Sequence, residues 1–230
     1  MKVTKESVKF IRKSNLSYTK IQKEVKKNFG IVISKSLLSY YKRTKDRLKI
    51  IDFKNASIEE IDWLNGIFLA DGCKYKNRNY LYTIKFALDN EKDQKIVKKL
   101  CYILKKLGSK YSFSYQKNSI IIKTYSKSLF DRLPNKERLF IPKNELAFLS
   151  GLIDGDGCKK GNAAVLVQYK NCQTMNYLSK FFKLTKKSFP VLTNFGLSRR
   201  RQYYINKRTC DLIRKGNLSI KLKTLLTNQI

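Results

Sequence analysis

The feature that most constrains the fold of this chain is an internal duplication. The stretch WLNGIFLADGCK, residues 63–74, is followed 85 residues later by FLSGLIDGDGCK, residues 148–159. After each copy, the hydrophobic pattern predicts the same series of strands, a helix, a hairpin and a short helix. A unit that occurs twice predicts two similar half-domains of αββαββα order, related by a pseudo-twofold axis.

The two copies stay aligned along most of their length. Helices are expected over 91–108 and 172–189, and hairpins over 111–125 and 191–207. Beyond the motifs the offset between the copies falls to about 81, because a loop of the first copy, KYKNRN, is longer than its counterpart KG. The predicted fold class is therefore α+β.

Each motif is expected to lie on a helix. In the first copy, Ser57 and Glu60 have the S-x-x-E spacing of a capping box, which predicts a helix over about 58–71 that stops at Gly72. Small residues four positions apart allow two helix backbones to approach closely, so the two motif helices are expected to cross face to face. Such residues occupy matching places in the two copies: Gly66 and Ala70 in the first, Gly151 and Gly155 in the second.

This crossing would bring Asp71 and Asp156 side by side, at the C-terminal ends of the two helices. The helix dipole disfavours an acid there by roughly 0.3–1 kcal/mol, and two adjacent carboxylates repel each other. A divalent cation such as Mg²⁺ would compensate, because it prefers carboxylate oxygens together with water and phosphate. The alternative, two ordinary turn residues before glycine, is disfavoured by the duplication. The paired acids therefore predict metal-assisted phosphodiester hydrolysis.

The charge of the chain indicates the class of its partner. There are 50 Lys and Arg residues against 17 Asp and Glu, a formal net charge of +33. A polyanion relieves self-repulsion on this scale, with nucleic acid the leading candidate and an anionic membrane the alternative. No apolar run reaches the roughly 18 residues of a spanning helix, and MKVTKESVKF at the start lacks the apolar core of a signal peptide. An intracellular protein that is not secreted is expected.

Cysteine and histidine usage excludes several kinds of site. The five cysteines are an odd number and form no CxxC pair, so neither disulfides nor zinc sites are expected, and a reducing compartment fits. The absence of histidine excludes nucleases and hydrolases that depend on a histidine base. An enzyme with this sequence must work with carboxylates, lysines, metal and water.

The first 50 residues form a basic block with its own pattern. Helices are expected over 17–30, ending at Gly30, and over 35–45, with a short turn between them. This order is typical of a helix-turn-helix, whose second helix enters the major groove of DNA. The alternative is a basic helical hairpin that only packs on its neighbour. The second helix would present these residues to DNA: Ser36, Ser39, Tyr40, Lys42 and Arg43.

The motifs resemble those of a known family. LSGLIDGDG is nearly the signature of the LAGLIDADG homing endonucleases, and LNGIFLADG is a more divergent copy, so the resemblance covers about residues 57–230. It implies that the motif helices form the interface between half-domains and that the strands form a saddle over DNA. It also implies that Asp71 and Asp156 bind catalytic Mg²⁺, for which Mn²⁺ can substitute. Family members cut both strands of a long target and leave short 3′ overhangs.

The resemblance also sets the expected organisation. Two motifs in one chain are typical of the single-chain members, so a monomer with a long asymmetric double-stranded DNA target is expected. The N-terminal block is outside the family core and is interpreted as an added DNA-binding module. The expected domains are a helix-turn-helix module over 1–50 and half-domains over 51–140 and 141–230.

Further roles follow from the resemblance. Asparagines at the ends of the second strands would position the nucleophilic water, and lysines near the segment that closes each repeat would stabilise charge on the phosphate, although both could be surface lysines. These residues are Asn90 and Asn171, and Lys143 and Lys223. The first motif departs from the signature at Leu69, where the second keeps Asp154, and this is interpreted as a packing change.

The strands are expected to contact DNA through basic and polar residues. Lys85 is expected on the face opposite Tyr82, Ile84 and Phe86, while the basic run SRRRQYY has the alternative of clamping phosphates without a sequence role. Lys and Arg pair with guanine and Gln with adenine. The candidates of the second repeat are Gln168, Lys170, Arg199, Arg200 and Arg201.

The sequence thus predicts a metal-dependent DNA endonuclease. One alternative is a non-cleaving DNA-binding regulator on the same core, although loss of the motif acids would be its expected mark. Another is a maturase that binds intron RNA. An intein is disfavoured, because protein splicing usually needs histidine and this chain has none.

Overall fold

The computed structural model describes residues 3–43, 51–76, 81–168, 172–193 and 196–223. The chain divides into two compact units, Met1–Ile50 and Ile51–Ile230. Within the described part of the chain, no helix has both the length and the apolar character needed to cross a membrane.

The first unit is a small bundle of helices. Its described elements are α1 (Lys5–Lys13), α2 (Tyr18–Phe29) and α3 (Lys35–Arg43). α2 ends at Gly30, which adopts a left-handed conformation with φ 65° and donates its N–H to the carbonyl of Lys26, as its sequence position predicts. α1 was not expected from the sequence. The core of the unit consists of Ile11, Ile21, Val25, Ile31, Ile33 and Leu38.

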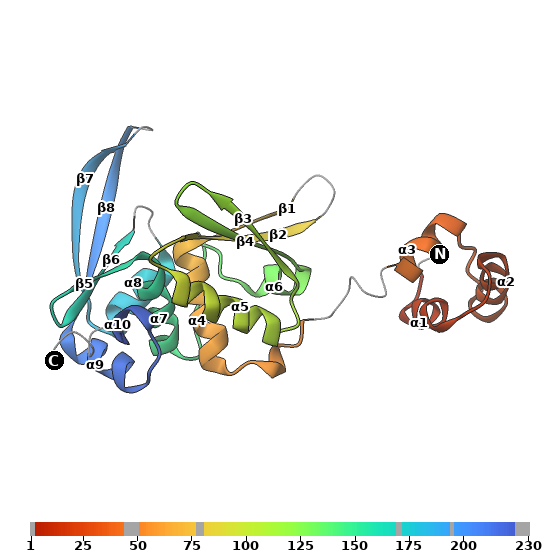
Figure 1. Ribbon diagram of the computed structural model, residues 1–230, viewed down its shortest axis with the longest axis horizontal. Helices are drawn as coiled ribbons and strands as arrows, with labels where there is room; N and C mark the ends of the chain where they lie inside the picture. The colour runs from red at the N-terminus through yellow and green to blue at the C-terminus, as the bar shows by residue number, and fades with distance from the viewer. Residues whose placement is uncertain (1–2, 44–50, 77–80, 169–171, 194–195, 224–230) are drawn as a thin grey trace. The chain divides into compact units, whose positions relative to one another are not determined.

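The second unit contains two similar halves (Figure 1). The first half forms an antiparallel sheet of order β1-β2-β4-β3, with helices against one face. Its elements are η1 (Phe53–Asn55), α4 (Ile58–Asp71), β1 (Gly72–Lys76), β2 (Tyr82–Asp89), α5 (Gln94–Lys106), β3 (Tyr111–Gln116), β4 (Ser119–Tyr125) and α6 (Lys127–Arg132).

The second half repeats this order in an antiparallel sheet β5-β6-β8-β7. The α+β class with two half-domain sheets is therefore confirmed, while the division of the unit at residue 141 stays a prediction. The elements are α7 (Glu145–Asp156), β5 (Gly157–Lys160), β6 (Ala163–Gln168), α8 (Gln173–Phe181), β7 (Thr185–Thr193), β8 (Gly196–Ile205), α9 (Lys207–Lys215) and α10 (Ile220–Lys223).

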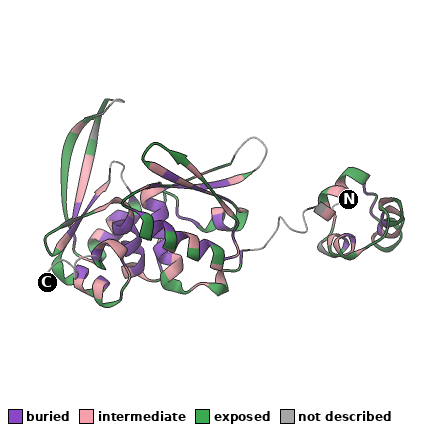
Figure 2. Cartoon of the chain, in the orientation of Figure 1, coloured by how far each residue is buried: buried purple, intermediate pink, exposed green. Residues whose placement is uncertain are grey.

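The motif helices α4 and α7 occupy the centre of the second unit, where Figure 2 shows buried residues concentrated. Both are apolar around most of their circumference, which is typical of a helix buried on all sides. The predicted capping box is present at the start of α4: Ser57 accepts the N–H of Glu60, and the Glu60 side chain accepts the N–H of Ser57.

Gly72 ends α4 as predicted, but for a different reason. Its φ of −93° is ordinary extended backbone, so no left-handed turn requires glycine there. A Cβ at this position would instead overlap the carbonyl oxygen and the ring of Phe68. Glycine is needed because β1 leaves the helix in direct contact with its last turn.

One expected helix is wrong in extent. The helix predicted over 172–189 ends at Phe181, and the strand β7 begins at Thr185. Lys183, with φ 51°, turns the chain, and Leu184 enters the core. The hairpin predicted to begin at residue 191 therefore begins six residues earlier.

Candidate functional site

The site is built on backbone contact between α4 and α7. A Cβ on Gly66 would overlap the carbonyl oxygen of Phe148 and lie 3.0 Å from Cα of Gly151. A Cβ on Gly151 would lie 2.8 Å from the backbone nitrogen of Ile67. Only glycine fits at these two places, so the helices cross without side chains between them.

The same approach continues to the ends of the two helices. A Cβ added to Gly155 would overlap the side chain of Ala70 and lie 2.6 Å from Oδ2 of Asp71. The four small residues named from the sequence thus lie together along the crossing. Asp71 is the last residue of α4 and Asp156 the last residue of α7.

The two aspartates are electrostatically coupled. Burial, and then the negative charge of Asp156, raise the pKa of Asp71 to about 7. Asp93, the N-cap of α5, adds a further negative charge, while Lys221 and Lys136 act in the opposite direction. A carboxyl with this pKa would be stabilised in its charged form by a nearby cation.

Two lysines hold equivalent places beside the acids. The Lys136 ammonium donates to the carbonyl of Ala70 at 3.4 Å, and the Lys221 ammonium donates to the carbonyl of Gly155 at 2.7 Å. Each therefore places positive charge at the negative end of one motif helix. Lys221 also lies 3.9 Å from Oδ1 of Asp93.

Sequence reasoning missed these two lysines. They are 85 residues apart, which is the offset between the motifs themselves and between Ala70 and Gly155, so the signal was present. The pair chosen instead, Lys143 and Lys223, has an offset of 80.

The structure does not bring Lys143 to the acids. Its backbone N–H donates to Oδ2 of Asp62 at 2.9 Å, immediately before Asn144, the N-cap of α7. The whole of α7, about 18 Å of helix, then separates it from Asp156. The proposed contact of Lys143 with a phosphate at the acid pair is therefore corrected.

Lys223 also has a different setting from the one expected. It ends α10, exposed, and its charge helps to lower the pKa of Lys99. Residues two apart on a helix do not share a face, so Lys221 and Lys223 point in different directions from α10.

Of the two expected asparagines, the structure describes one. Asn90 follows β2, donates its N–H to the carbonyl of Asn118 at 2.7 Å, and accepts from the Gln94 side chain through its own carbonyl. It lies in the turn that leads to Asp93. Asn171 and Lys170 lie outside the described residues.

Asp154, the earlier motif acid, has a structural role. It is completely buried and accepts four hydrogen bonds, from the indole of Trp63 at 2.7 Å, the hydroxyl of Ser219 at 2.6 Å and the backbone N–H groups of Ile220 and Lys221 at 3.0 and 2.9 Å. It thus fixes the start of α10, from which Lys221 reaches the acids.

In the first half, a hydrophobic side chain takes the place of this anchor. Leu69, at the place of Asp154, is buried in the core of the second half. The expected packing change at Leu69 thus has a clear structural basis.

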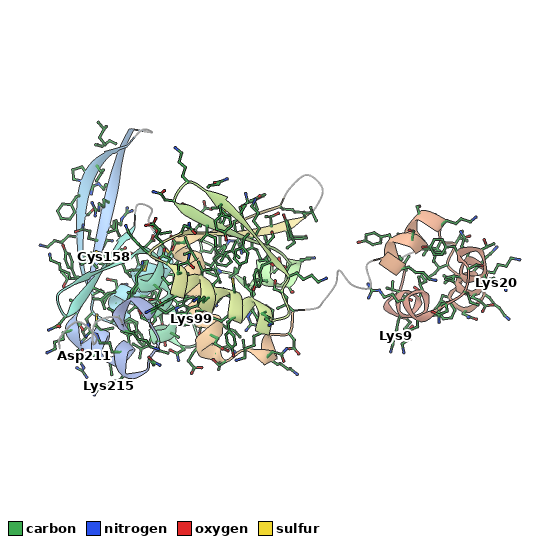
Figure 3. The ribbon with its side chains drawn as sticks, viewed as in Figure 1. Lys9, Lys20, Lys99, Cys158, Asp211 and Lys215 are labelled. Atoms are coloured by element: carbon green, nitrogen blue, oxygen red, sulfur yellow. The ribbon has the colours of Figure 1, made fainter. Side chains whose placement is uncertain are left out.

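Lys99 of α5, which is labelled in Figure 3, contacts the buried indole of Trp63. Its ammonium lies 4.2 Å from the ring centre of Trp63 and donates to the carbonyl of Leu218 at 2.8 Å. Burial lowers the pKa of Lys99 to about 8, although Asp154 acts in the opposite direction.

The first sheet presents a basic and aromatic face away from its helices. Ile84 and Phe86 are buried, so Lys85 lies on the opposite face, as expected. Its ammonium is 4.9 Å from the ring centre of Tyr75, and a hydrogen bond to that tyrosine raises the pKa of Lys85. Cys73, Lys123 and Ser112 stand in one row with Lys85 across the sheet.

The three arginines of the second sheet do not share one face. Arg199, Arg200 and Arg201 are consecutive residues of β8, so Arg200 points to one face and its neighbours to the other. Gln168 is the backbone partner of Arg201 across β6 and β8. A single face of this strand therefore offers DNA at most part of the basic run.

In the first unit, the expected DNA-contacting residues differ in availability. Ser36 and Tyr40 on α3 are exposed. The Lys42 ammonium donates to the carbonyl of Leu16 at 3.2 Å and lies 5.5 Å from the ring centre of Tyr18, so it is engaged within the unit. The side chain of Arg43 lies outside what the structure describes.

Comparisons with known proteins identify the fold. No family model matches the chain. The chain is 30% identical over 177 residues to the uncharacterized protein MJ0398 of Methanocaldococcus jannaschii; the match covers 70% of this chain and 63% of that relative, so the chain spans less than two thirds of the relative's length.

Two solved structures are similar. The structure of I-DmoI in complex with DNA and Ca has a TM-score of 0.50 and 16% identity, covering 74% of this chain and 98% of that one. The N-terminal LAGLIDADG domain of DUF199/WhiA has a TM-score of 0.49 and 19% identity, covering 75% and 90%. With the duplicated motifs on crossing helices, the likeness to I-DmoI shows that this chain has the LAGLIDADG fold.

Proposed function

We propose that this protein binds double-stranded DNA and cleaves both strands by metal-dependent hydrolysis, with Asp71 and Asp156 as the metal ligands. The observation that carries the proposal is the pairing of these two carboxylates at the C-terminal ends of α4 and α7, which cross in backbone contact at their glycines. Burial and the charge of Asp156 raise the pKa of Asp71 there to about 7. Folding alone gains nothing from two acids at the negative ends of two helices.

The donor set fits a hard divalent cation. Among the residues that the structure describes, no three His, Cys, Asp or Glu side chains converge, so the protein would supply two carboxylates. Mg²⁺ is usually held by one or two carboxylates, with water and substrate phosphates completing the shell. Such an ion, or Mn²⁺ in its place, would polarise the scissile phosphate and make a bound water more acidic.

The protein's own residues would add positive charge and position the duplex. Lys136 and Lys221 stand beside the acids, where an ammonium can stabilise charge that develops on a phosphate. The open face of the first sheet, with Lys85 and Lys123, and the basic strand β8 offer contacts to the DNA backbone. The structure of I-DmoI in complex with DNA supports this use of the fold.

The added N-terminal unit fits a second DNA contact. α2 and α3 are joined by a short turn that is held by a hydrogen bond of 2.6 Å from the Gln22 side chain to the carbonyl of Ile33. A helix-turn-helix needs such a short connection, and Ser36 and Tyr40 on α3 are exposed, as contact with DNA would require.

A second candidate is a DNA-binding protein that does not cleave. The observation in its favour is that Lys136 and Lys221 already oppose the negative charge at the acid pair, which reduces the need for a metal ion. The chain would then use the same sheets and the N-terminal unit to bind DNA, with the acids serving only to hold the two lysines.

One experiment separates the candidates. The full chain is incubated with a randomised duplex library and Mg²⁺, and both bound and cut molecules are sequenced. We expect one long asymmetric site with staggered cuts, no cutting by Asp71→Asn or Asp156→Asn despite retained binding, and normal cutting by Asp131→Asn, which changes an exposed aspartate of α6.

The other outcomes are equally informative. Binding of one sequence without cutting, in Mg²⁺ and in Mn²⁺, would favour the non-cleaving protein. Normal cutting by either motif variant would refute the assignment of the aspartates.

A further inference from the structure

The two lysines beside the acid pair are held differently, and Lys136 is the less constrained of the two. It lies on the connection between α6 and α7, where residues 135–139 are all exposed. Its ammonium donates to the carbonyl of Ala70 at 3.4 Å and forms no ion pair within 4 Å among the residues that the structure describes. Little therefore fixes the direction in which this ammonium points.

Lys221, in contrast, lies on a helix that both halves of the second unit hold in place. Asp154 of α7 accepts the backbone N–H groups of Ile220 and Lys221 at the start of α10. From the first half, the ammonium of Lys99 on α5 donates to the carbonyl of Leu218 at 2.8 Å. The backbone of α10 is thereby fixed against elements of both halves.

Asp93, at the start of α5, acts on the ammonium of Lys221 itself. Its Oδ1 lies 3.9 Å from the Lys221 nitrogen, and the Asp93 side chain is only 12% exposed. Its other carboxylate oxygen, Oδ2, accepts the backbone N–H of Asp89 at 3.0 Å, which fixes the direction of the carboxylate. The Lys221 ammonium is thus attracted by a fixed carboxylate of the first half while it donates to the carbonyl of Gly155 in the second, at 2.7 Å.

The second half carries a different residue at the place that corresponds to Asp93. Asp93 is the N-cap of α5, whereas the N-cap of α8 is Cys172, which is buried in the apolar core of the second half. The four residues that follow Cys172, QTMN, include no acid. The first turn of α8 therefore offers Lys136 no carboxylate like the one that α5 offers Lys221.

We propose that Asp93 is a positioning residue for cleavage of one of the two DNA strands, and that it acts by directing the Lys221 ammonium towards the phosphate of that strand. The proposal rests on the cleavage proposed above. The two lysines occupy places related by the pseudo-twofold axis, and the two DNA backbones are themselves related by twofold axes, so each lysine serves one strand.

The chemistry of the ammonium explains why a carboxylate helps here. A lysine has three N–H donors, so contacts with the Gly155 carbonyl and the Asp93 carboxylate leave one donor for a phosphate oxygen. A charged group that is oriented before the substrate binds loses less conformational freedom during the reaction. Asp93 therefore makes its contribution through the direction of Lys221 and not through contact with DNA.

The two strands should then depend on different side chains. Cleavage of one strand requires Lys221 and Asp93, whereas cleavage of the other requires Lys136 and is independent of Asp93. The variant Asp93→Asn keeps an oxygen that can accept the N–H of Asp89 and removes the charge that attracts Lys221. It should therefore cut one strand long before the other, so that nicked duplex accumulates.

Separate cleavage rates for the two strands test the proposal. The full chain selects its duplex from a randomised library, and the two strands of that duplex are labelled with different fluorophores and cut in single turnovers with Mg²⁺. Lys221→Met and Lys136→Met identify the strand that each lysine serves. We expect Asp93→Asn to slow the strand of Lys221 about tenfold, while the rate for the other strand and the dissociation constant in Ca²⁺ change less than about twofold.

A double variant tests whether Asp93 acts through Lys221. Asp93→Asn should slow the reaction no further when it is added to Lys221→Met, because the side chain that it positions is already gone, and it should keep its full effect when it is added to Lys136→Met. The matched control is Glu60→Gln, which neutralises the ion-pair partner of Lys106 on the same helix α5. This control should leave the rates of both strands unchanged.

Each outcome decides the question. Equal slowing of both strands by Asp93→Asn, or an unchanged or faster rate for the strand of Lys221, would overturn the proposal while cleavage itself stays established. Equal slowing of both strands by Lys221→Met, or a further loss in the double variant with Asp93→Asn, would also overturn it. If the unchanged protein cuts neither strand of the duplex that it selects, the proposed cleavage fails and this proposal fails with it.

Discussion

The close crossing of α4 and α7 predicts that Gly66→Ala strongly destabilises the second unit. The added Cβ would lie 3.0 Å from Cα of Gly151 and from the nitrogen of Leu152, and closer still to the carbonyl oxygen of Phe148. Ordinary contact begins at 3.4 Å, so the two backbones must move apart by about 1 Å. All three obstacles are backbone atoms, so no change of rotamer relieves them.

The expected cost follows from this geometry. Overpacking a well-packed core typically costs about 1–3 kcal/mol, and more where the backbone must move. We expect Gly66→Ala to lower the free energy of unfolding by about 3 kcal/mol or more. Urea denaturation followed by circular dichroism measures the difference, as a shift of the midpoint at an unchanged slope.

A second glycine provides the control. Gly216, with φ −75°, lies near only the flexible side chain of Leu218, 3.2 Å from the added Cβ, and the carbonyl of Leu212 at 3.5 Å. Gly216→Ala should therefore change stability by no more than about 1 kcal/mol. If Gly66→Ala unfolds at the same urea concentration as Gly216→Ala, the helices do not cross in backbone contact.

Three further predictions concern charged groups. Asp154→Asn should lower the free energy of unfolding by about 3 kcal/mol in urea titrations, because buried groups that donate to the Asp154 carboxylate lose their acceptor. An unchanged midpoint would contradict the four hydrogen bonds to this carboxylate. The pKa of Asp71 is raised from 3.8 to about 7, so the free energy of unfolding of the metal-free protein should fall by up to about 4 kcal/mol as the pH rises from 4 through 7. The variant Asp71→Asn should lack this loss of stability. Parallel profiles of stability against pH for the two proteins would refute the prediction. Lys221→Met should slow cleavage of the selected duplex by tenfold or more, while Lys223→Met, which removes the same charge two residues away, should not; equal rates would exclude a role for Lys221.

The sequence predicts the motif helices well because their signals are local. The capping box at Ser57, the apolar run and the small residues all act within α4, and the observed bounds agree with the expected ones. The duplication, together with the small residues that let the two helices cross, was enough to predict that Asp71 and Asp156 lie side by side. Because the two motifs align residue by residue, the position predicted for a residue in one half could be transferred to its equivalent in the other half, which a single copy of the motif would not allow.

The errors occur where distant contacts decide the structure. Residues 182–189 continue a pattern that also suits a helix, but pairing of β7 with β8 makes Thr185 onward a strand. Lys136 lies on a connection between α6 and α7 that has no periodic pattern, so its position beside the acids depends on tertiary packing. Lys143 was predicted from its spacing in the sequence. It lies at the N-terminal end of α7, whereas Asp156 lies at the C-terminal end of that helix.

The environment of Trp63 gives the chain a built-in optical probe. It is the single tryptophan of the sequence, and its indole joins α4 to Asp154 of α7 under the ammonium of Lys99. Any separation of the two halves would break the indole hydrogen bond and admit water to the ring. The intrinsic emission of the unlabelled protein, excited selectively at the indole band, therefore reports on this one interface.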